Sequence, residues 1–378
     1  MRSISTVWKD PLIDSTSADP AINASILSSV KQKISRIPFL IKLTNWEFWP
    51  FNVLYLPAFF YYAYLIIRAR TPFYFSTSNP GLENAGMLGE SKFRLYNQID
   101  KSIQPKTLFF EAQSSLESVL SEVDILKLSF PLIAKPDVGE RGSGVEKIKD
   151  KEELKRYISG SKINFLIQEF IDLPIELGIF YYKYPGQEKG TVSSVTQKGF
   201  LQIIGDGEST IEQLIKKNKR ALLQWDKLVK RFGASFQEIP SNGEVLMLEE
   251  IGNHCRGTAF LDRNHEIDQK LTDAFDHLAS GIDGFYFGRF DLRCLSFDEL
   301  RDLKNFKIIE LNGAGGEPGH IYHPGASLWN AYRVIFHHMK VMFEISRKNK
   351  ELGNPYMTLK EGVGLWRRVR KYNKLRSL

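Results

Sequence analysis

Apolar and polar residues alternate in short runs from residue 131 onward. Alternation with a period of two is typical of β-strands, because successive side chains point to opposite faces of a sheet. It predicts strands at 131–136, 145–149, 165–170, 175–185, 190–197, 284–293 and 306–312. Helical spacing predicts helices at 151–159, 210–232, 266–280 and 325–349. Strands and helices mix without strict alternation, which predicts an α+β fold.

The chain before residue 131 is less regular. Residues 1–30 are polar and poorly patterned. No charged segment leads into an apolar core at the N-terminus, so we expect no cleaved signal peptide. Residues 72–78 (PFYFSTS) predict a short strand, the Asn79-Pro80-Gly81 sequence predicts a turn, and a helical stretch is expected from Lys92.

Residues 51–67 (FNVLYLPAFFYYAYLII) carry no charge over seventeen positions. Aromatic residues precede this stretch and cations follow it, as in a membrane-interface anchor, at Trp46, Phe48, Trp49, Arg68 and Arg70. The stretch is at the short limit for a spanning helix and contains Pro57, so we favour a shallow or re-entrant membrane segment (46–70) over a span. The alternative is a helix or hairpin buried against the main domain.

The formal net charge of +7 is concentrated at the C-terminal end. Seven basic residues and Glu361 give residues 359–378 a charge of +6, so the rest of the chain is close to neutral. A near-neutral body argues against nucleic-acid binding. Residues 365–378 place apolar side chains among these cations at near-helical spacing, which fits a helix lying on an anionic leaflet. The alternative is a solvated basic tail.

The overall composition is that of a globular protein. The chain has 378 residues, 43% hydrophobic and 25% charged, which excludes disordered, collagen-like and disulfide-framework classes. This length allows two or three subdomains around one site. Cys255 and Cys294 lack any zinc-ligand spacing, so we expect no structural zinc and a reducing compartment.

A glycine-rich loop follows the strand that carries Lys135. Backbone amides at glycine can approach a phosphate without obstruction from a side chain. The loop is neither a Walker A loop nor a dinucleotide fingerprint, because no Lys-Ser or Lys-Thr follows it and a strand comes next. A simple hairpin turn is the alternative. The candidate phosphate contacts here are Lys135, Gly139, Gly142, Ser143 and Gly144.

Two late strands carry a candidate metal site. On the first strand, Arg289, Asp291 and Arg293 share a face, and on the second strand Glu310 and Asn312 share a face. The short connection 295–304 predicts that the strands are antiparallel neighbours. Asp291, Glu310 and Asn312 would then converge as hard oxygen ligands, which suit Mg²⁺ shared with water and nucleotide phosphates. The alternative is a row of polar side chains on a solvent-exposed face of the sheet. The apolar residues between these positions make that alternative less consistent with the sequence, because they indicate buried strands.

A third candidate lies where residues 165–170 end and 175–185 begin. Gln168 and Glu169 end the first strand, and Glu176 opens the next. This crossing is suited to presenting Glu169 and the Phe170–Ile171 backbone to an adenine edge, and Glu176 to a ribose. By itself an acidic hairpin explains the pattern equally well.

Taken together, these residues resemble the ATP-grasp superfamily, and D-alanine–D-alanine ligase-like carboxylate–amine ligases in particular. The resemblance covers about residues 85–350. It implies an ATP-grasp fold, in which two α+β subdomains grip the nucleotide, here with a short N-terminal subdomain. Residues 202–215 (QIIGDGESTIEQLI) resemble a lid segment of cyanophycin- and glutathione-synthetase-like members.

The resemblance also implies roles for single residues. Lys135 resembles the central phosphate-contacting lysine, Lys92 the earlier nucleotide lysine, and Glu169 and Glu176 the adenine- and ribose-contacting acids. Residues 288–291 resemble the family's Gly-Arg-x-Asp, in which the arginine, here Arg289, faces the acyl phosphate. Residues 310–312 resemble its Glu-x-Asn metal motif.

The implied activity is ATP-dependent amide formation through an acyl phosphate, with ATP and two Mg²⁺ ions, or Mn²⁺, as cofactors. Residues after Asn312 and at 252–265 depart from the ligase pattern, so D-alanine is not carried over. Candidates for contact with the substrate lie in these segments: His254, Arg256, Gly315, Gly316, Glu317 and His320. We expect Gly315 and Gly316 to offer backbone amides to the oxyanion.

These observations divide the chain into four parts. They are an N-terminal extension (1–70), a short pre-ATP-grasp region (71–125), an ATP-grasp domain (126–350, with its lid at about 181–210) and a basic tail (351–378). The use of ATP implies a cytoplasmic location, and the apolar segment adds a peripheral position on the membrane face and an amphiphilic substrate. A soluble ligase making a peptide-like metabolite, an inactive nucleotide-binding protein and a kinase stay open as alternatives.

Overall fold

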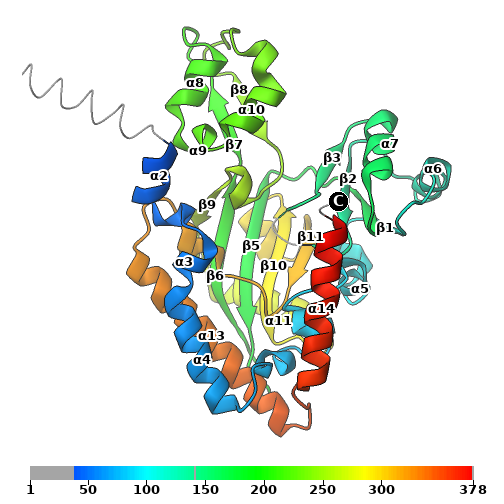
Figure 1. Ribbon diagram of the computed structural model, residues 1–378, viewed down its shortest axis with the longest axis vertical. Coiled ribbons are helices and arrows are strands. Elements are labelled where there is room, and N and C mark those ends of the chain that lie inside the picture. Colours follow the sequence, from blue (N-terminus) through cyan, green and yellow to red (C-terminus); the bar gives the residue numbers. More distant parts are fainter. Residues whose placement is uncertain (1–37, 140–141, 377–378) are drawn as a thin grey trace, which may run out of the picture.

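Two antiparallel sheets and a protruding hairpin organise the molecule (Figure 1). The structure, a computed structural model, describes residues 38–139 and 142–376, so the expected lead-in over residues 1–30 lies outside the described part. The strand orders are β1-β4-β2-β3 in the small sheet and β11-β10-β5-β6-β9 in the large one. Both sheets mix with helices, which confirms the α+β prediction.

The small sheet is covered on one face by two helices. Its strands are β1 (Thr107–Phe110), β2 (Leu132–Pro136), β3 (Glu146–Ile148) and β4 (Phe165–Glu169), and its helices are α6 (Leu116–Ile125) and α7 (Lys151–Gly160). Leu132 and Phe165 are fully buried against Val119 of α6 and Leu154 of α7. The predicted strands in this region are confirmed.

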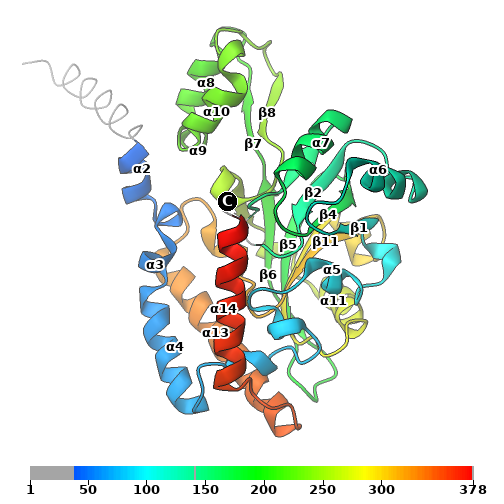
Figure 2. The same ribbon diagram turned by 45° about the vertical axis from the view of Figure 1, so that its right-hand side comes forward.

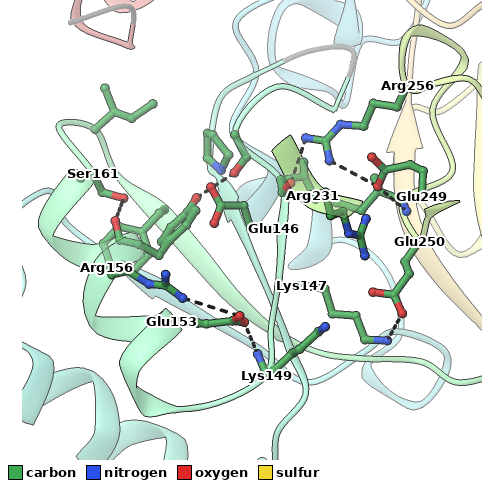
Figure 3. A pocket seen from close by; sticks show the side chains of 18 of the residues that line it. Glu146, Lys147, Lys149, Glu153, Arg156, Ser161, Arg231, Glu249, Glu250 and Arg256 are labelled. Carbon is green, nitrogen blue, oxygen red and sulfur yellow. Dashed lines mark hydrogen bonds and ion pairs between the residues drawn. The ribbon is translucent and has the colours of Figure 1, made fainter. Parts of the chain in front are cut away.

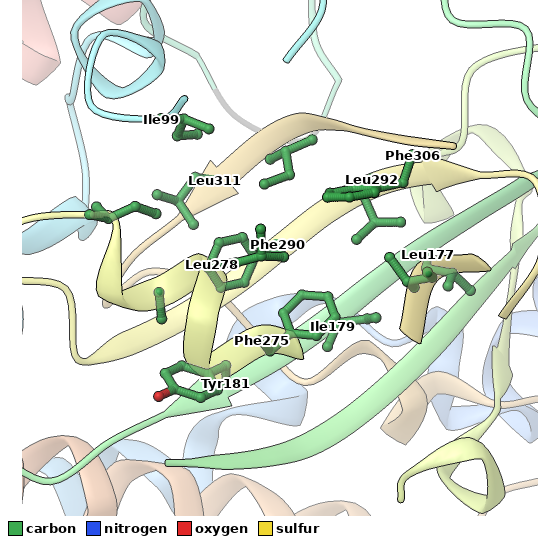
Figure 4. Packing of buried hydrophobic residues seen from close by; sticks show 14 of the residues in the cluster. Ile99, Leu177, Ile179, Tyr181, Phe275, Leu278, Phe290, Leu292, Phe306 and Leu311 are labelled. Carbon is green, nitrogen blue, oxygen red and sulfur yellow. The ribbon is translucent and has the colours of Figure 1, made fainter. Parts of the chain in front are cut away.

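The large sheet carries the main hydrophobic core on one face. Its strands are β5 (Ile175–Tyr182), β6 (Thr191–Gly199), β9 (Ala259–Asp262), β10 (Phe287–Cys294) and β11 (Phe306–Asn312). Helices α11 (Gln269–Ser280) and α12 (Phe297–Arg301) cover this face. Figure 4 shows Phe275 and Leu278 of α11 against Ile179 and Phe290 of the sheet.

The opposite face of the large sheet is apolar at one end and polar at the other. At the apolar end, Phe180 and Phe287 pack in one cluster with Leu65 of α4 (Leu56–Ala69) and Met342 of α13 (Leu328–Glu351). Toward the other end, alternate residues on this face are charged, including Glu176, Arg289 and Asp291. The site described below lies at that polar end.

A helical hairpin unit protrudes beyond the sheets at residues 201–249 (Figures 1 and 2). Its strands β7 (Leu201–Ile204) and β8 (Val245–Glu249) enclose α8 (Ile211–Lys217), α9 (Lys219–Leu222) and α10 (Trp225–Phe232). The prediction of one helix at 210–232 is wrong, because Asn218 leaves the helical conformation and caps α9 with its side chain. Residues 191–199, expected in the lid, instead form β6 inside the large sheet.

The N-terminal apolar stretch forms α2 (Pro38–Thr44), α3 (Phe51–Leu54) and α4, along one edge of the molecule (Figure 2). Pro57 lies in the first turn of α4, where its missing amide leaves no hydrogen bond unmade. Leu65 is 1% exposed, whereas Phe60 is 73% and Ile67 is 76% exposed. One face of the stretch is therefore core and the other is open. No helix in the described ranges combines the length and apolarity that crossing a bilayer requires.

Residues 72–78 do not form the predicted strand. They form the 3₁₀ helix η2 (Tyr74–Thr77), in which Tyr74, Phe75 and Thr77 are all buried. Thr77 donates a hydrogen bond to the backbone carbonyl of Ser346 on α13 at 2.9 Å. Burial of these side chains and the contact with α13 therefore favour a 3₁₀ helix over the strand that the sequence pattern predicts. The predicted helix at Lys92 is short: α5 (Lys92–Tyr96).

The basic C-terminal segment is a packed helix, α14 (Leu359–Arg376), rather than a solvated tail. Leu365 is 4% exposed, and Gly362 lies so close to the Phe73 ring that a methyl group there would clash. Tyr372 accepts a 3.4 Å hydrogen bond from the amide of Val138, next to the glycine loop. The remaining short elements are 3₁₀ helices: η1 (Trp46–Phe48), η3 (Glu83–Gly86), η4 (Lys101–Ile103), η5 (Gly233–Ser235), η6 (His254–Arg256), η7 (Asn264–Glu266) and η8 (Gly319–Tyr322).

The two faces of α4 predict opposite responses to truncation. Leu65→Ala should lower the free energy of unfolding by about 2–5 kcal/mol, because it leaves a cavity against α13. Ile67→Ala, two residues away and exposed, should change it by less than about 0.5 kcal/mol. Urea unfolding followed by circular dichroism measures both. Equal, small effects would mean that α4 does not pack on the domain.

Candidate functional site

The polar end of the large sheet opens into a cavity of about 580 Å³. Its walls come from the small sheet, the large sheet, the loop after β8 and residues 47–54 of the N-terminal segment. The residues predicted for phosphate, metal and adenine contact gather here from segments far apart in the sequence. Among them are Lys92, Lys135, Gln168, Glu176, Arg289 and Glu310.

Strands β10 and β11 place the candidate metal ligands side by side. Arg289 pairs with Asn312 and Asp291 pairs with Glu310 in the antiparallel register, as the sequence pattern predicted. The Asn312 amide donates to Asp291 Oδ2 at 2.9 Å. Two carboxylates and one amide oxygen are therefore neighbours on one face.

Arg289 grips Asp291 with two parallel hydrogen bonds. Its Nε and Nη2 lie 3.1 and 2.9 Å from the two carboxylate oxygens. Asp291 is 1% exposed. Burial alone would raise the pKa of Asp291, but the charges of Arg289 and Lys198 outweigh burial and lower it. A side chain at Gly178 would lie 3.0 Å from Asp291 Oδ1, so glycine leaves room for this pair.

Glu310 is balanced by a lysine from α5. Lys92 Nζ lies 3.2 Å from Glu310 Oε1 and donates to the Gly139 carbonyl at 2.7 Å. Burial alone would raise the pKa of Glu310, but the charges of Lys92, Lys135 and Lys198 together outweigh burial and lower it. This contact brings the predicted nucleotide lysine and the predicted metal ligand together.

The donor set fits Mg²⁺ by its chemistry. Asp291, Glu310 and Asn312 offer hard oxygens next to room for water and phosphate. Within the described residues no group of three or more His, Cys, Asp or Glu side chains is placed to hold a metal ion.

Lys135 is buried at the floor of the cavity, with 6% of its surface exposed. Its Nζ donates to Tyr96 Oη at 2.8 Å, to Gln168 Oε1 at 2.9 Å and to the Ile309 carbonyl at 3.3 Å. All three acceptors are uncharged, so burial lowers the pKa of Lys135 to about 7. Gln168 thus holds the lysine in place and also lines the cavity.

The glycine loop is held from outside the small sheet. Arg256 Nη2 donates to the Gly142 carbonyl at 2.8 Å and to the Val145 carbonyl at 3.0 Å. Gly142 and Gly144 have φ of 67° and 74°, which favours glycine. Gly139, Gly142 and Ser143 line the cavity. Arg256, predicted to contact substrate, therefore fixes the glycine loop.

The crossing from β4 to β5 forms an aromatic shelf. Lys147 lies 4.2 Å and Arg293 5.4 Å from the centroid of the Phe170 ring. Arg293 also donates to the Ile171 carbonyl and to Glu176 Oε2, both at 2.9 Å. Glu169 accepts from the Lys106 amide at 3.1 Å. Glu169, Phe170, Ile171 and Glu176 all line the cavity.

Lys198 is a member of the site that the sequence analysis missed. It lies on β6, with Nζ 2.9 Å from Glu176 Oε1 and 3.7 Å from Asp291 Oδ1. Burial alone would lower its pKa, but these two carboxylates raise it. No local motif marks Lys198. Glu47, Tyr96 and Tyr322 were missed for the same reason.

The predicted substrate residues separate into two groups. His254, Gly315 and Glu317 line the cavity, and the Glu317 carbonyl accepts from Arg289 Nη1 at 2.9 Å. His320 does not line it: its Nδ1 lies 2.6 Å from the Ser194 hydroxyl, and burial lowers its pKa.

The expected oxyanion amides are already occupied. The Gly315 amide donates to the Gly86 carbonyl, and the Gly316 amide donates to the Gly313 carbonyl, both at 2.9 Å. Residues 85–86 approach this loop more closely than the sequence indicates. Arg289 is the remaining predicted donor to an oxyanion.

A second cavity of about 660 Å³ lies on the outer side of the glycine loop (Figure 3). It is lined by α7, β3 and the end of β8. Figure 3 shows Lys147 paired with Glu250 at 3.0 Å and Arg256 beside Glu249. Of the predicted site residues only Gly144 and Arg256 reach it, so the 580 Å³ cavity is the candidate active site.

Comparisons with known proteins give one family match and one curated relative. Residues 93–180 match the family model described as the RimK-like ATP-grasp domain. Over 126 residues the chain is 33% identical to a bifunctional glutathione biosynthesis protein of Clostridium perfringens, a match covering 29% of this chain. The match spans 16% of the length of that relative.

Solved structures give looser matches. A D-alanine–D-alanine ligase from Bacillus anthracis complexed with ATP is 14% identical, with 70% of this chain and 68% of that chain covered and a TM-score of 0.38. A D-Ala:D-Ser ligase from Enterococcus faecalis is 16% identical, with 71% and 62% covered and a TM-score of 0.37. A bifunctional glutathione synthetase from Pasteurella multocida is 14% identical, with 65% and 36% covered and a TM-score of 0.33.

The pKa of Lys135 predicts how stability depends on pH. Above about pH 7 the folded protein releases the Lys135 proton, whereas the unfolded chain keeps it up to about pH 10. The unfolded state then binds more protons, so this residue makes stability rise with pH by up to about 1.4 kcal/mol per pH unit. Urea unfolding of wild type and Lys135→Met between pH 6 and 10 measures the difference. A difference independent of pH would contradict the buried, uncharged lysine.

Proposed function

We propose that the chain is an ATP-dependent carboxylate–amine ligase, because residues 93–180 match the RimK-like ATP-grasp domain. In this reaction ATP phosphorylates a carboxylate, an amine displaces the phosphate, and an amide, ADP and phosphate result. The observation that carries the proposal is the cluster of Arg289, Asp291, Glu310 and Asn312, which shares one cavity with Lys92 and Lys135. Phosphoryl transfer needs such positioning and charge neutralisation more than covalent chemistry.

The nucleotide occupies the space between the two sheets in this proposal. Adenine lies at the Phe170–Ile171 crossing with Glu169, and the ribose reaches Glu176. Lys92, Lys135 and the amides of Gly139, Gly142, Ser143 and Gly144 face the phosphates. The protruding unit at 201–249 is then the lid, in place of 181–210, and the ATP-grasp domain extends over about 126–350.

Asp291, Glu310 and Asn312 would hold Mg²⁺, in two ions or with Mn²⁺ as a substitute. When bound, these ions neutralise charge on the β- and γ-phosphates. With the two carboxylates balanced by metal, Arg289, Lys92 and Lys198 would be available to phosphate and acyl oxygens. Arg289 stabilises the oxyanion that forms when the amine attacks.

The two alternative functions, an inactive nucleotide-binding protein and a kinase, require different parts of the site. An inactive nucleotide-binding protein has no need to keep the whole set of cations and oxygens in one cavity. A kinase, which stops after phosphoryl transfer, needs no acceptor amine. The cavity extends past Arg289 to His254 and Tyr322, which leaves room for a second substrate and favours ligation.

A screen for substrate-dependent ADP release tests the proposal. Full-length protein with Mg²⁺-ATP should release ADP when one class of amino acid, fatty acid or lipid amine is added, and mass spectrometry should detect an amide. Glu310→Gln should lower the rate at least about 100-fold, because it removes a metal ligand, while the exposed Glu351→Gln should not. ADP release without any amide would favour the kinase.

The finer proposal places the reaction at a membrane surface on the cytoplasmic side, with an amphiphilic substrate; a soluble peptide-like metabolite is the alternative. The supporting observation is the open face of residues 39–67. Large apolar side chains there are at least a third exposed: Phe39, Leu43, Phe51, Val53, Leu56, Phe59, Phe60, Tyr64 and Ile67. Lys42, Arg68 and Arg70 are the flanking cations. Aromatic residues with flanking cations are typical of proteins that bind anionic lipid surfaces.

Flotation with liposomes tests the membrane proposal. Wild type should float with phosphatidylserine-containing vesicles, and a Phe60→Ser/Ile67→Ser variant should float at least about 10-fold less, because each exposed side chain contributes about 1.5 kcal/mol or more when buried. Ile125→Ser, which removes an isolated side chain of 71% exposure on α6, is the matched control. Failure of wild type to float would remove the membrane from the proposal.

A further inference from the structure

The cavity ends, beyond Arg289, at residues contributed by the N-terminal segment. Glu47 lies on η1 and lines the cavity with Trp49, Phe51 and Leu54. The 3₁₀ helix that carries Glu47 is tied to the core, because Trp46 Nε1 donates to the Ala326 carbonyl at 2.7 Å. An acidic side chain is therefore held at the far end of the cavity, although its own side chain is only 9% exposed.

Glu47 meets two cationic or titratable partners. Arg220 of α9, in the protruding unit, forms an ion pair with Glu47 Oε2. His254 Nε2 lies 3.5 Å from the same oxygen. Burial alone would raise the pKa of Glu47, but the hydrogen bond from His254 and the charge of Arg220 outweigh burial and lower it. Glu47 is thus an anion that can orient the imidazole.

The imidazole of His254 is fixed by aromatic rings. The ring centroids of Phe48, Tyr322 and Phe260 lie 5.8, 5.3 and 5.4 Å from that of His254. A carboxylate can only accept hydrogen bonds, so the Glu47 contact favours a proton on Nε2 and a lone pair on Nδ1. Within the described residues no group hydrogen-bonds Nδ1, and the side chain lines the cavity.

Glu317 and Tyr322 link His254 to Arg289 through successive contacts. The Glu317 carbonyl accepts from Arg289 at 2.9 Å, and the Glu317 carboxylate accepts from Tyr322 Oη at 3.1 Å. The Tyr322 ring in turn contacts His254. A chain of contacts along the cavity wall therefore links the imidazole to the arginine that the proposed function assigns to the acyl oxyanion.

Amide formation needs a base at this position. An alkylamine is an ammonium ion near pH 7, and only the neutral amine is a nucleophile. A histidine oriented by a carboxylate is a recurring arrangement for taking such a proton. In structures without substrate the orienting contact is commonly long, as the 3.5 Å distance is here.

We propose that His254, oriented by Glu47, is the general base of the acceptor amine, and that the acceptor carries an apolar group. This inference rests on the proposed ligase function. His254 Nδ1 takes one proton from the ammonium, and the amine nitrogen then forms its bond to the acyl carbon. The bond from that carbon to the phosphate oxygen breaks, and the phosphate leaves with the electron pair and takes the second nitrogen proton. His254 returns its proton to solvent.

The apolar part of the acceptor follows from the walls around His254. Trp49, Phe51 and Leu54 on one side and Phe260 and Tyr322 on the other line this end of the cavity. Phe51 is also 37% exposed and belongs to the open apolar face of the N-terminal helices. An alkyl or aromatic chain on the amine can therefore extend from the site along that face.

Two nucleophiles separate the base from the rest of catalysis. The assay uses Mg²⁺-ATP, the carboxylate with the fastest ADP release in the screen, and either hydroxylamine or n-octylamine. Hydroxylamine is uncharged near pH 7 and needs no base. His254→Gln should keep hydroxamate formation within about 3-fold of wild type and lose the octylamide by about 10²–10⁴-fold. The loss should shrink at high pH, where free octylamine is abundant.

Several charged or titratable groups face the imidazole. They are Glu47 on η1, Arg220 on α9, and Tyr322 and Glu317 after β11. Glu47→Gln should show a smaller loss with the same selectivity for n-octylamine. His265→Gln, on a side chain of 67% exposure away from the cavity, is the control and should match wild type.

The possible outcomes are decisive for different claims. If His254→Gln loses product formation equally with both nucleophiles, or with neither, His254 is not the general base. If the wild type forms the hydroxamate but no octylamide, the acceptor amine does not carry an apolar group of this kind. Neither product in wild type contradicts the proposed ligase function instead.

A measurement independent of turnover decides the base in that last case. In ¹⁵N-histidine spectra of the full-length protein, His254 should be protonated on Nε2 and bare on Nδ1, and n-octylamine should shift its signals but not those of His265. Glu47→Gln should abolish this tautomer preference. A proton on Nδ1 in the neutral wild-type imidazole would overturn the proposal.

Discussion

The buried carboxylate of Asp291 is the constraint on which the site depends. At 1% exposure, an unpaired anion would be too costly for a folded protein to retain. The bidentate contact with Arg289, the Asn312 amide and the nearby Lys198 together offset that cost. Arg289 also holds the Glu317 carbonyl, so the same arginine fixes the loop after β11.

This arrangement explains why the cavity contains so many ions of both signs. Lys92 forms an ion pair with Glu310, and Lys198 forms an ion pair with Glu176. In the proposed complex, a magnesium triphosphate brings cations for the carboxylates and anions for the lysines and arginine. The internal pairs can then be exchanged for pairs with the ligand, so charges are balanced both before and after binding.

The N-terminal segment connects parts of the molecule that the sheets leave separate. Trp46 is bonded to the core before α13, whereas Glu47 is paired with Arg220 of the protruding unit. The next residues line the cavity, and α4 packs on α13 through Leu65. A stretch that is uncharged over seventeen positions thus has three surfaces: one in the core, one in the cavity and one open.

Strand periodicity alone determined the α+β class, most strands of both sheets and the face shared by Arg289, Asp291, Glu310 and Asn312, because alternation directly reports which side chains lie together. Spacing could not reveal Lys198, Glu47 or Tyr96, because they reach the cavity from separate elements with no local motif. Nor could it show that Gly315 and Gly316 donate to carbonyls at 86 and 313, or that residues 72–78 coil against α13. Those outcomes depend on which surfaces meet, and only tertiary packing decides which polar groups remain free and which pKa values change.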